Sequence, residues 1–134
     1  MEKEQLLPSN LKETIKKSDN YLFIFIPGEE QAKINILPIG SLNIKKILIK
    51  LEKFSPDLVK GISEVLIELG LNDNLIHTTG LCFSKNRECY YETYVDLGKS
   101  DVNEFKEENI KENFLEVNRV IDLCIINITK DSCS

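Results

Sequence analysis

The chain has no apolar run that approaches the roughly 20 residues of a membrane-spanning helix. Its longest apolar run, Tyr21 to Pro27, has the length of a strand. The N-terminal sequence also lacks a basic segment followed by an apolar stretch, which a secretory signal requires. We therefore expect a cytoplasmic protein with no membrane partner.

The sequence also has no excess of basic residues, because 22 acidic side chains outnumber 17 basic ones and give a net charge of −5. Proteins that hold nucleic acid by its phosphates normally present a basic surface, so we expect no nucleic-acid partner. RNA binding stays open as a weaker alternative because Tyr90, Tyr91 and Tyr94 fall on one expected strand, where aromatic rings can stack bases. Glu88 and Glu92 beside them would repel phosphate.

Residues that commonly carry catalysis are scarce. His77 is the single histidine and no Cys-x-x-Cys pair occurs, so the three or four ligands of a metal site are missing. The same scarcity argues against a nucleophile activated by a histidine base. The six glycines are too scattered to form a phosphate-binding loop. We therefore expect no catalytic residues, no metal and no cofactor, and predict that the protein is not an enzyme.

The four cysteines are expected to be reduced, because the chain shows no secretory signal. Cys82 and Cys89 flank the expected turn over residues 84–87, which places them directly opposite each other on paired strands. Opposite Cβ atoms lie about 4.5–5.5 Å apart, more than the roughly 3.8 Å of a relaxed disulfide. Two interpretations follow: a strained, reducible bridge that acts as a redox switch, or two small buried hydrophobic side chains. The second is the one we expect.

The length of 134 residues and a hydrophobic content of 42% indicate one globular domain with an N-terminal extension. Asn10 and Glu13 form a capping-box pattern and predict a short helix. Residues 21–26 and 33–37 predict a hairpin that ends at 38–40. The predicted division is an extension over 1–44 that packs on the domain, a domain over 45–130 and a tail over 131–134.

The pattern from residue 45 onward predicts the order β-α-β-β-α-β. Ser55 as N-cap, Pro56 in the first turn and Gly70 as C-cap delimit the first helix. A second helix is expected to begin at 100–101, with a middle so polar that it could be two pieces. Strands are expected at 45–52, 75–83, 88–97 and 121–128. Right-handed crossovers on this order give an α+β, ferredoxin-like fold, with a four-stranded antiparallel sheet and two helices on one face.

These residues resemble the ACT domain, a small regulatory module that binds amino acids and related metabolites. The resemblance covers roughly the last two-thirds of the chain and rests on four segments, at 47–51, 55–58, 66–72 and 91–96. It implies a non-catalytic module that forms a homodimer and holds an amino-acid-like effector between two copies. The ligand-binding residues it implies are Ser55, Asp57 and Leu58 in one copy and Asn72, Asn74 and Ile76 in its neighbour.

Two positions depart from the family pattern. Phe54 replaces an acid, and Asp57 replaces a glycine that lets the backbone come close to the effector. The departures favour an alternative from another class, a protein-interaction subunit that binds no ligand. Amides at the N-terminus of the first helix would favour an anion such as a carboxylate if a ligand does bind.

Overall fold

The computed structural model describes residues 18, 20–40, 42–83, 85, 87–98 and 106–128. The chain divides into two compact units, residues 1–40 and 41–134. The helix expected from Asn10 and the tail at 131–134 lie outside the described residues. The described helices include none long and apolar enough to cross a membrane.

The first unit contains an antiparallel hairpin of two strands, β1 (Asn20–Pro27) and β2 (Ala32–Ile39). The hairpin is therefore confirmed, but the expected end of its second strand is wrong, because β2 continues through Pro38 to Ile39. Pro38 lies opposite Tyr21. Among the described strands, β2 pairs only with β1, and such an edge strand tolerates a proline that has no N–H to donate.

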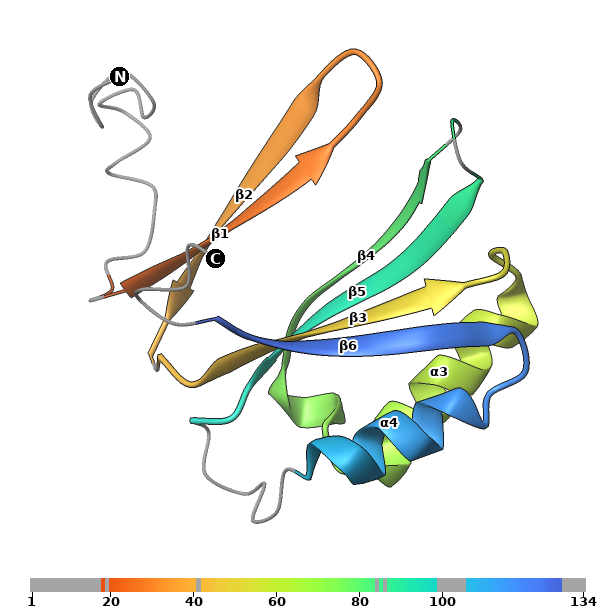
Figure 1. Cartoon of the computed structure of the whole chain (residues 1–134). Helices are drawn as coiled ribbons and strands as arrows, with labels where there is room; N and C mark the ends of the chain where they lie inside the picture. Colours follow the sequence, from red (N-terminus) through yellow and green to blue (C-terminus); the bar gives the residue numbers. More distant parts are fainter. Residues whose placement is uncertain are drawn as a thin grey trace. The chain divides into compact units, whose positions relative to one another are not determined.

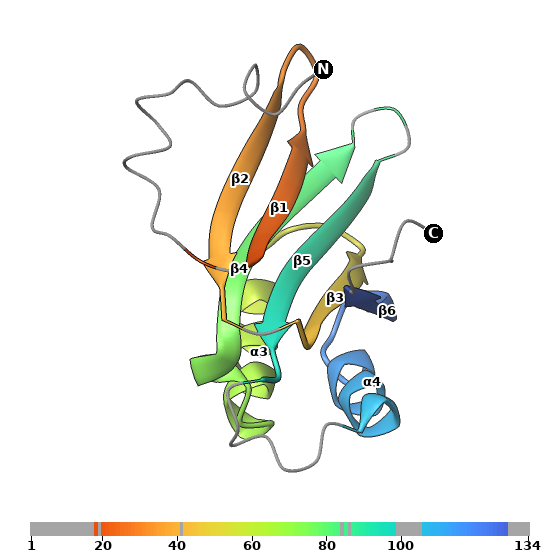
Figure 2. The same cartoon turned by 90° about the vertical axis from the view of Figure 1, so that its left-hand side faces the viewer.

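The second unit is an α+β layer structure built on a four-stranded sheet. Its elements in chain order are β3 (Ile44–Leu51), α3 (Pro56–Glu68), a short 3₁₀ turn η1 (Asn72–Asn74), β4 (Leu75–Phe83), β5 (Glu88–Asp96), α4 (Glu107–Leu115) and β6 (Val120–Ile128). The strand order is β4-β5-β3-β6, and every neighbouring pair is antiparallel. Figures 1 and 2 show α3 and α4 together on one face of this sheet.

The core lies between that sheet face and the two helices. The predicted inward face of β3 is confirmed, since Ile47, Ile49 and Leu51 are almost completely buried. Their partners come from both helices and from β5 and β6: Leu58, Ile62, Val65, Leu66, Ile110, Phe114, Val95 and Leu123. Full burial of such a side chain contributes about 1.5–3 kcal/mol, so this layer is the main source of stability for the unit.

Both ends of α3 follow from local sequence signals, as predicted. The Ser55 hydroxyl accepts a hydrogen bond from the Leu58 amide at 3.2 Å, and Pro56 begins the helix. At the other end Gly70 adopts a left-handed φ of 71°. The Leu71 amide then donates to Leu66 O at 2.9 Å, and the Gly70 amide donates to Ile67 O at 3.0 Å. This pattern is a Schellman motif, which satisfies carbonyls that the helix end leaves free.

The described part of the second predicted helical stretch contains α4 (Glu107–Leu115). The expected start at 100–101 lies outside the described residues, and α4 is described from Glu107. Ile110 and Phe114, four residues apart, supply its buried stripe. Val117 lies in the turn after the helix rather than within it.

The β4–β5 hairpin has the register that the sequence predicted, with Cys82 directly opposite Cys89. The expectation of two buried, reduced cysteines is nevertheless wrong for this pair, because the two sulfurs form a disulfide and Cys82 is exposed. Their Cα atoms are 4.1 Å apart, the close spacing of a pair that exchanges no backbone hydrogen bonds. Cys124 on β6 is a free, exposed cysteine.

Candidate functional site

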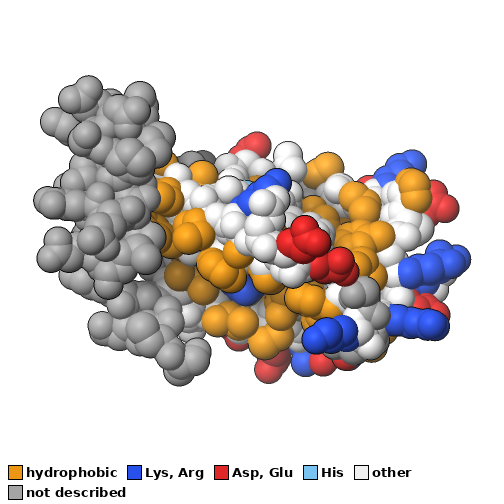
Figure 3. Space-filling model, turned by 90° about the horizontal axis from the view of Figure 1, so that it is seen from above, with side chains coloured by type: hydrophobic (Ala, Val, Ile, Leu, Met, Phe, Trp, Pro, Cys, Tyr) orange, Lys and Arg blue, Asp and Glu red, His pale blue; other side chains and the backbone are white. Residues whose placement is uncertain are grey.

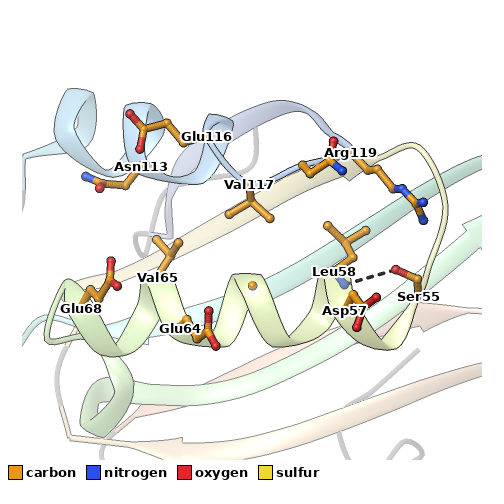
Figure 4. Close-up of a pocket in the computed structure, with 12 residues that line it drawn as sticks. Ser55, Asp57, Leu58, Glu64, Val65, Glu68, Asn113, Glu116, Val117 and Arg119 are labelled. Carbon is orange, nitrogen blue, oxygen red and sulfur yellow. Dashed lines mark hydrogen bonds between the residues drawn. The ribbon is translucent and has the colours of Figure 1, made fainter.

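A groove of about 400 Å³ runs between α3 and the segment that joins α4 to β6 (Figure 4). The first turn of α3 closes one end, and the last turns of α3 and α4 form the other. The residues that line it are Ser55, Asp57, Leu58, Gly61, Glu64, Val65, Glu68, Asn113, Glu116, Val117, Asn118 and Arg119.

Three of the predicted ligand-binding residues, Ser55, Asp57 and Leu58, line this groove together. Ser55 caps the helix, and Leu58 is buried against the core. Asp57 is exposed in the first helical turn, where backbone amides have no acceptor within the helix. The groove therefore begins at a helix end that attracts negative charge, with a carboxylate of the chain already beside it.

The other three predicted residues lie elsewhere in the unit. Asn72 and Asn74 form η1, after the C-terminal end of α3, and Ile76 follows at the start of β4. The buried side chain of Asn74 donates from Nδ2 to the Asp96 carbonyl at 2.9 Å, which ties η1 to the end of β5. None of the three lines the groove of its own chain. Their contact with the effector from a neighbouring copy stays a prediction.

The middle of the groove is apolar. Leu58 and Val65 point from α3 toward the segment that follows α4, and Val117 points from that segment back toward α3 (Figure 4). Gly61 keeps this space open, because a Cβ atom there would come within 3.0 Å of Val117 Cγ1. A side chain at position 61 would thus push Val117 outward and narrow the groove.

The two ends of the groove differ in charge, because Asp57 accompanies Arg119 at one end, whereas the charged residues at the other end are all acidic. Arg119 lies at the Ser55 end, whereas Glu68 and Glu116 lie at the far end (Figure 4). Arg119 has a left-handed φ of 75°, and its carbonyl accepts a hydrogen bond from the Glu52 amide at 3.0 Å. Such a backbone conformation costs a non-glycine residue about 1–3 kcal/mol and concentrates at functional sites. Sequence reasoning missed Arg119, because no local pattern brings the turn before β6 to the start of α3.

The opposite face of the sheet carries two similar polar clusters. Lys46 forms an ion pair with Glu92 at 3.0 Å, and the Tyr94 hydroxyl donates to Glu92 at 2.8 Å. Four residues along the strands, Lys50 forms an ion pair with Glu88 at 3.1 Å, and the Tyr90 hydroxyl donates to Glu88 at 2.7 Å. Two carboxylates beside the tyrosines repel phosphate, which argues against the RNA-binding alternative.

Hydrogen bonding in these clusters shifts several pKa values. The hydrogen bond from Tyr90, and then the one from Lys50, lower the pKa of Glu88. The same contacts raise the pKa of Tyr90 and of Lys50, because each holds its proton toward the carboxylate. Burial, followed by the hydrogen bond to Glu92, raises the pKa of Tyr94. On this face of the sheet, each of the two lysines is therefore paired with a glutamate of the same face.

His77 lies on β4, outside the groove lining, and its Nε2 contacts the Thr79 hydroxyl. Among the described residues, no three His, Cys, Asp or Glu side chains lie close enough together to hold a metal ion. Comparison of the chain with family models, curated proteins and solved structures finds no match in any of the three.

Proposed function

We propose that this chain is a non-catalytic regulatory module that binds a small, amino-acid-like molecule in the α3 groove. The proposal includes the ferredoxin-like fold and the kinship to ACT domains that the sequence pattern suggests. The strand order β4-β5-β3-β6, with both helices on one face, supports that fold. Three residues that the resemblance implied, Ser55, Asp57 and Leu58, lie together in the groove and support the ligand-binding part.

The proposal is carried by the one cationic side chain of the groove lining, Arg119, which lies with Asp57 at the Ser55 end, and by the carboxylates farther along the groove. A ligand carboxylate would be attracted to the guanidinium of Arg119 and to the amides at the start of α3. A ligand ammonium would be attracted to Glu64, Glu68 and Glu116. A short apolar stem between the two charged groups would lie against Leu58, Val65 and Val117. This chemistry is that of an amino acid or a closely related metabolite.

The spacing along α3 refines the ligand class. With a rise of 1.5 Å per residue, Glu64 lies about 10 Å along the axis from Asp57, and Glu68 about 16 Å. An α-amino and an α-carboxyl group on one carbon cannot span that distance. The groove therefore fits best a molecule whose ammonium and carboxylate lie at opposite ends, such as a diamino acid or an ω-amino acid.

The groove offers little for catalysis, which supports a binding role. Ser55 carries the single hydroxyl in the groove lining, and its oxygen already accepts a hydrogen bond from the Leu58 amide. No histidine lines the groove to act as a base. Bound effector would instead shift the chain between states by its difference in affinity for them, a pair of copies being the assembled state that the resemblance implies.

A protein-interaction subunit without ligand is the second candidate, and the hairpin unit favours it. One face of that hairpin carries exposed apolar side chains: Tyr21, Phe23, Phe25 and Ile34. Phe25 is 63% exposed and Phe23 is 58% exposed. Hydrophobic side chains that reach the surface can be seen in Figure 3. Sedimentation of the wild-type chain and of a Phe23→Glu, Phe25→Glu variant would reveal an assembly that depends on this face.

Thermal melts of the full chain against the twenty amino acids, ω-amino acids and common nucleotides test the ligand directly. A ligand at one hundred times its Kd stabilises the folded state by about 2.7 kcal/mol, which raises Tm by roughly 5–15 °C for a domain of this size. We expect hits among molecules with separated charges. Arg119→Gln and Glu64→Gln should each abolish the shift, whereas Glu108→Gln, outside the groove, should leave it intact. Flat melts across the panel would overturn the proposal in favour of the interaction subunit.

A further inference from the structure

We propose that the Cys82–Cys89 disulfide is a reversible thiol–disulfide exchange site whose redox state reaches the N-terminal end of α3. The bond joins the two strands beside the turn that connects β4 to β5, and its cysteines are seven residues apart in sequence. It is the one disulfide among the described residues. Neither cysteine lines the α3 groove.

The two sulfurs lie in different surroundings, which sets the direction of exchange. Cys82 is exposed, whereas Cys89 is partly buried and packs against the hydrophobic core. An external thiolate therefore reaches the sulfur of Cys82 more easily. Structural disulfides that resist reduction are commonly enclosed, whereas an exposed sulfur at a hairpin end is open to attack.

The exchange needs a dithiol reductant and two electrons. A thiolate of the dithiol attacks Cys82 Sγ, forms a mixed disulfide with it and expels Cys89 Sγ as a thiolate, which then takes up a proton. The second thiol of the reductant then attacks the reductant sulfur that is bonded to Cys82 and releases Cys82 as a thiolate, which takes up a proton. The products are two protein thiols and the cyclic disulfide of the reductant. The reverse sequence restores the bond.

A direct packing contact links the hairpin end to the helix. Gly80 lies two residues before Cys82, so both project to the same face of β4. The Phe54 ring packs on Gly80 so closely that a Cβ atom there would come within 2.7 Å of its Cζ. Phe54 also packs against the core and directly precedes Ser55, the N-cap of α3.

The disulfide holds β4 against β5 next to the surface on which Phe54 rests. When the bond is reduced, the turn end of the hairpin is held by its backbone pairing and its connecting loop alone, and it opens locally more often because its residues are exposed and few buried contacts hold it. Phe54 then loses part of its support, and the first turn of α3 loosens with it. An effect on ligand affinity rests on the proposed function, whereas the change in the helix end does not.

Hydrogen exchange of the full chain, with Cys124→Ser and Cys133→Ser to leave only the pair, tests the coupling. The oxidised form is compared with the form reduced by dithiothreitol, and alkylation followed by mass measurement confirms each redox state. We expect reduction to speed exchange about tenfold both at residues 80–91 and at residues 54–59. Oxidised dithiothreitol or a glutathione buffer should restore the slow exchange.

Two variants make the result specific. Cys82→Ser with Cys89→Ser should exchange like the reduced form and should not respond to dithiothreitol. Phe54→Leu should keep the response at 80–91 and lose it at 54–59; if it fails to fold, Gly80→Ala, which displaces the ring, takes its place. A reduction that leaves residues 54–59 unchanged in the parent chain would overturn the coupling. A bond that does not re-form would overturn reversibility, and neither outcome depends on whether a ligand binds.

Discussion

The ring of Phe54 packs on the backbone of Gly80, and no β-carbon fits between them. Gly80→Ala should therefore destabilise the domain by about 1 kcal/mol, the low end of the cost of overpacking, because the tip of the ring can move. Urea unfolding of Gly80→Ala, Phe54→Leu and the double variant measures the coupling. The cost of Gly80→Ala should fall to near zero in the Phe54→Leu background. Additive costs would show that contact with the Phe54 ring is not the reason why an alanine at position 80 destabilises the domain.

Asp57 occupies the position where a glycine would let a ligand approach the helix end. Asp57→Gly should strengthen binding of any ligand found in the melts, since it removes both an obstruction and a negative charge beside the expected carboxylate. Asp57→Asn separates the two causes, because it removes the charge and keeps the bulk. Calorimetric titration gives the affinities. An unchanged Kd in both variants would show that the first turn of α3 is not part of the site.

The Ser55 hydroxyl bonds to the Leu58 amide and caps α3. Ser55→Ala should lower the free energy of unfolding by about 1 kcal/mol, the usual cost of a lost N-cap. Ser63→Ala, in the middle of the same helix, is the matched control and should be neutral or slightly stabilising. Chemical denaturation compares them. Equal effects of the two substitutions would contradict the cap.

The cluster of Lys50, Glu88 and Tyr90 predicts a pH dependence with a definite sign. Glu88 has a lowered pKa in the folded state. Its contribution to the stability of the fold is therefore full above the ordinary pKa of about 4.3 and is lost as pH falls through the lowered pKa. Lys50 and Tyr90 have raised pKa values, so their contributions are full below about pH 10 and are lost as pH rises further.

The difference in stability between wild type and Glu88→Gln should therefore be constant between about pH 5 and pH 9 and should shrink at both ends. Urea unfolding from pH 3 to pH 11 measures it, and Glu108→Gln on the surface of α4 serves as the control. A difference that does not change between pH 5 and pH 3 would rule out Glu88 as the titrating group.

The disulfide should also contribute to the thermodynamic stability of the domain. Its closed loop is short, so replacing both cysteines by serine should cost about 2–3 kcal/mol, mainly through the greater freedom of the unfolded chain. Thermal unfolding of Cys82→Ser with Cys89→Ser, compared with Cys124→Ser on the exposed surface of β6, measures this. Identical midpoints for the two variants would contradict it.

Local signals predicted the second unit well. The alternation in β3 and the apolar stripe of α3 report directly on which side chains are buried, and Ser55, Pro56 and Gly70 set the helix ends through their own backbone chemistry. The register of Cys82 with Cys89 also followed from the turn length alone. These features depend on residues that are near one another in sequence.

Features that depend on distant residues were not predicted. Nothing in the turn before β6 indicates that Arg119 lies at the start of α3, because α4 and its packing on the sheet bring it there. The sequence does not decide between a bond and burial for Cys82 and Cys89, because the exposure of β4 at its end depends on what packs around it. Pro38 indicates a break when it is considered by itself, because the edge position that tolerates it is a property of the whole hairpin.

Ligand binding in the groove is tested by titrating the ¹⁵N-labelled chain with a diamino acid such as lysine and following the amide chemical shifts. We expect saturable shifts along the groove, around Ser55, Asp57 and Arg119 at one end and around Glu64, Glu68 and Glu116 toward the other. These shifts should disappear in Arg119→Gln. Shifts that are absent at millimolar ligand, or that fall outside the groove, would contradict a ligand-binding role for it.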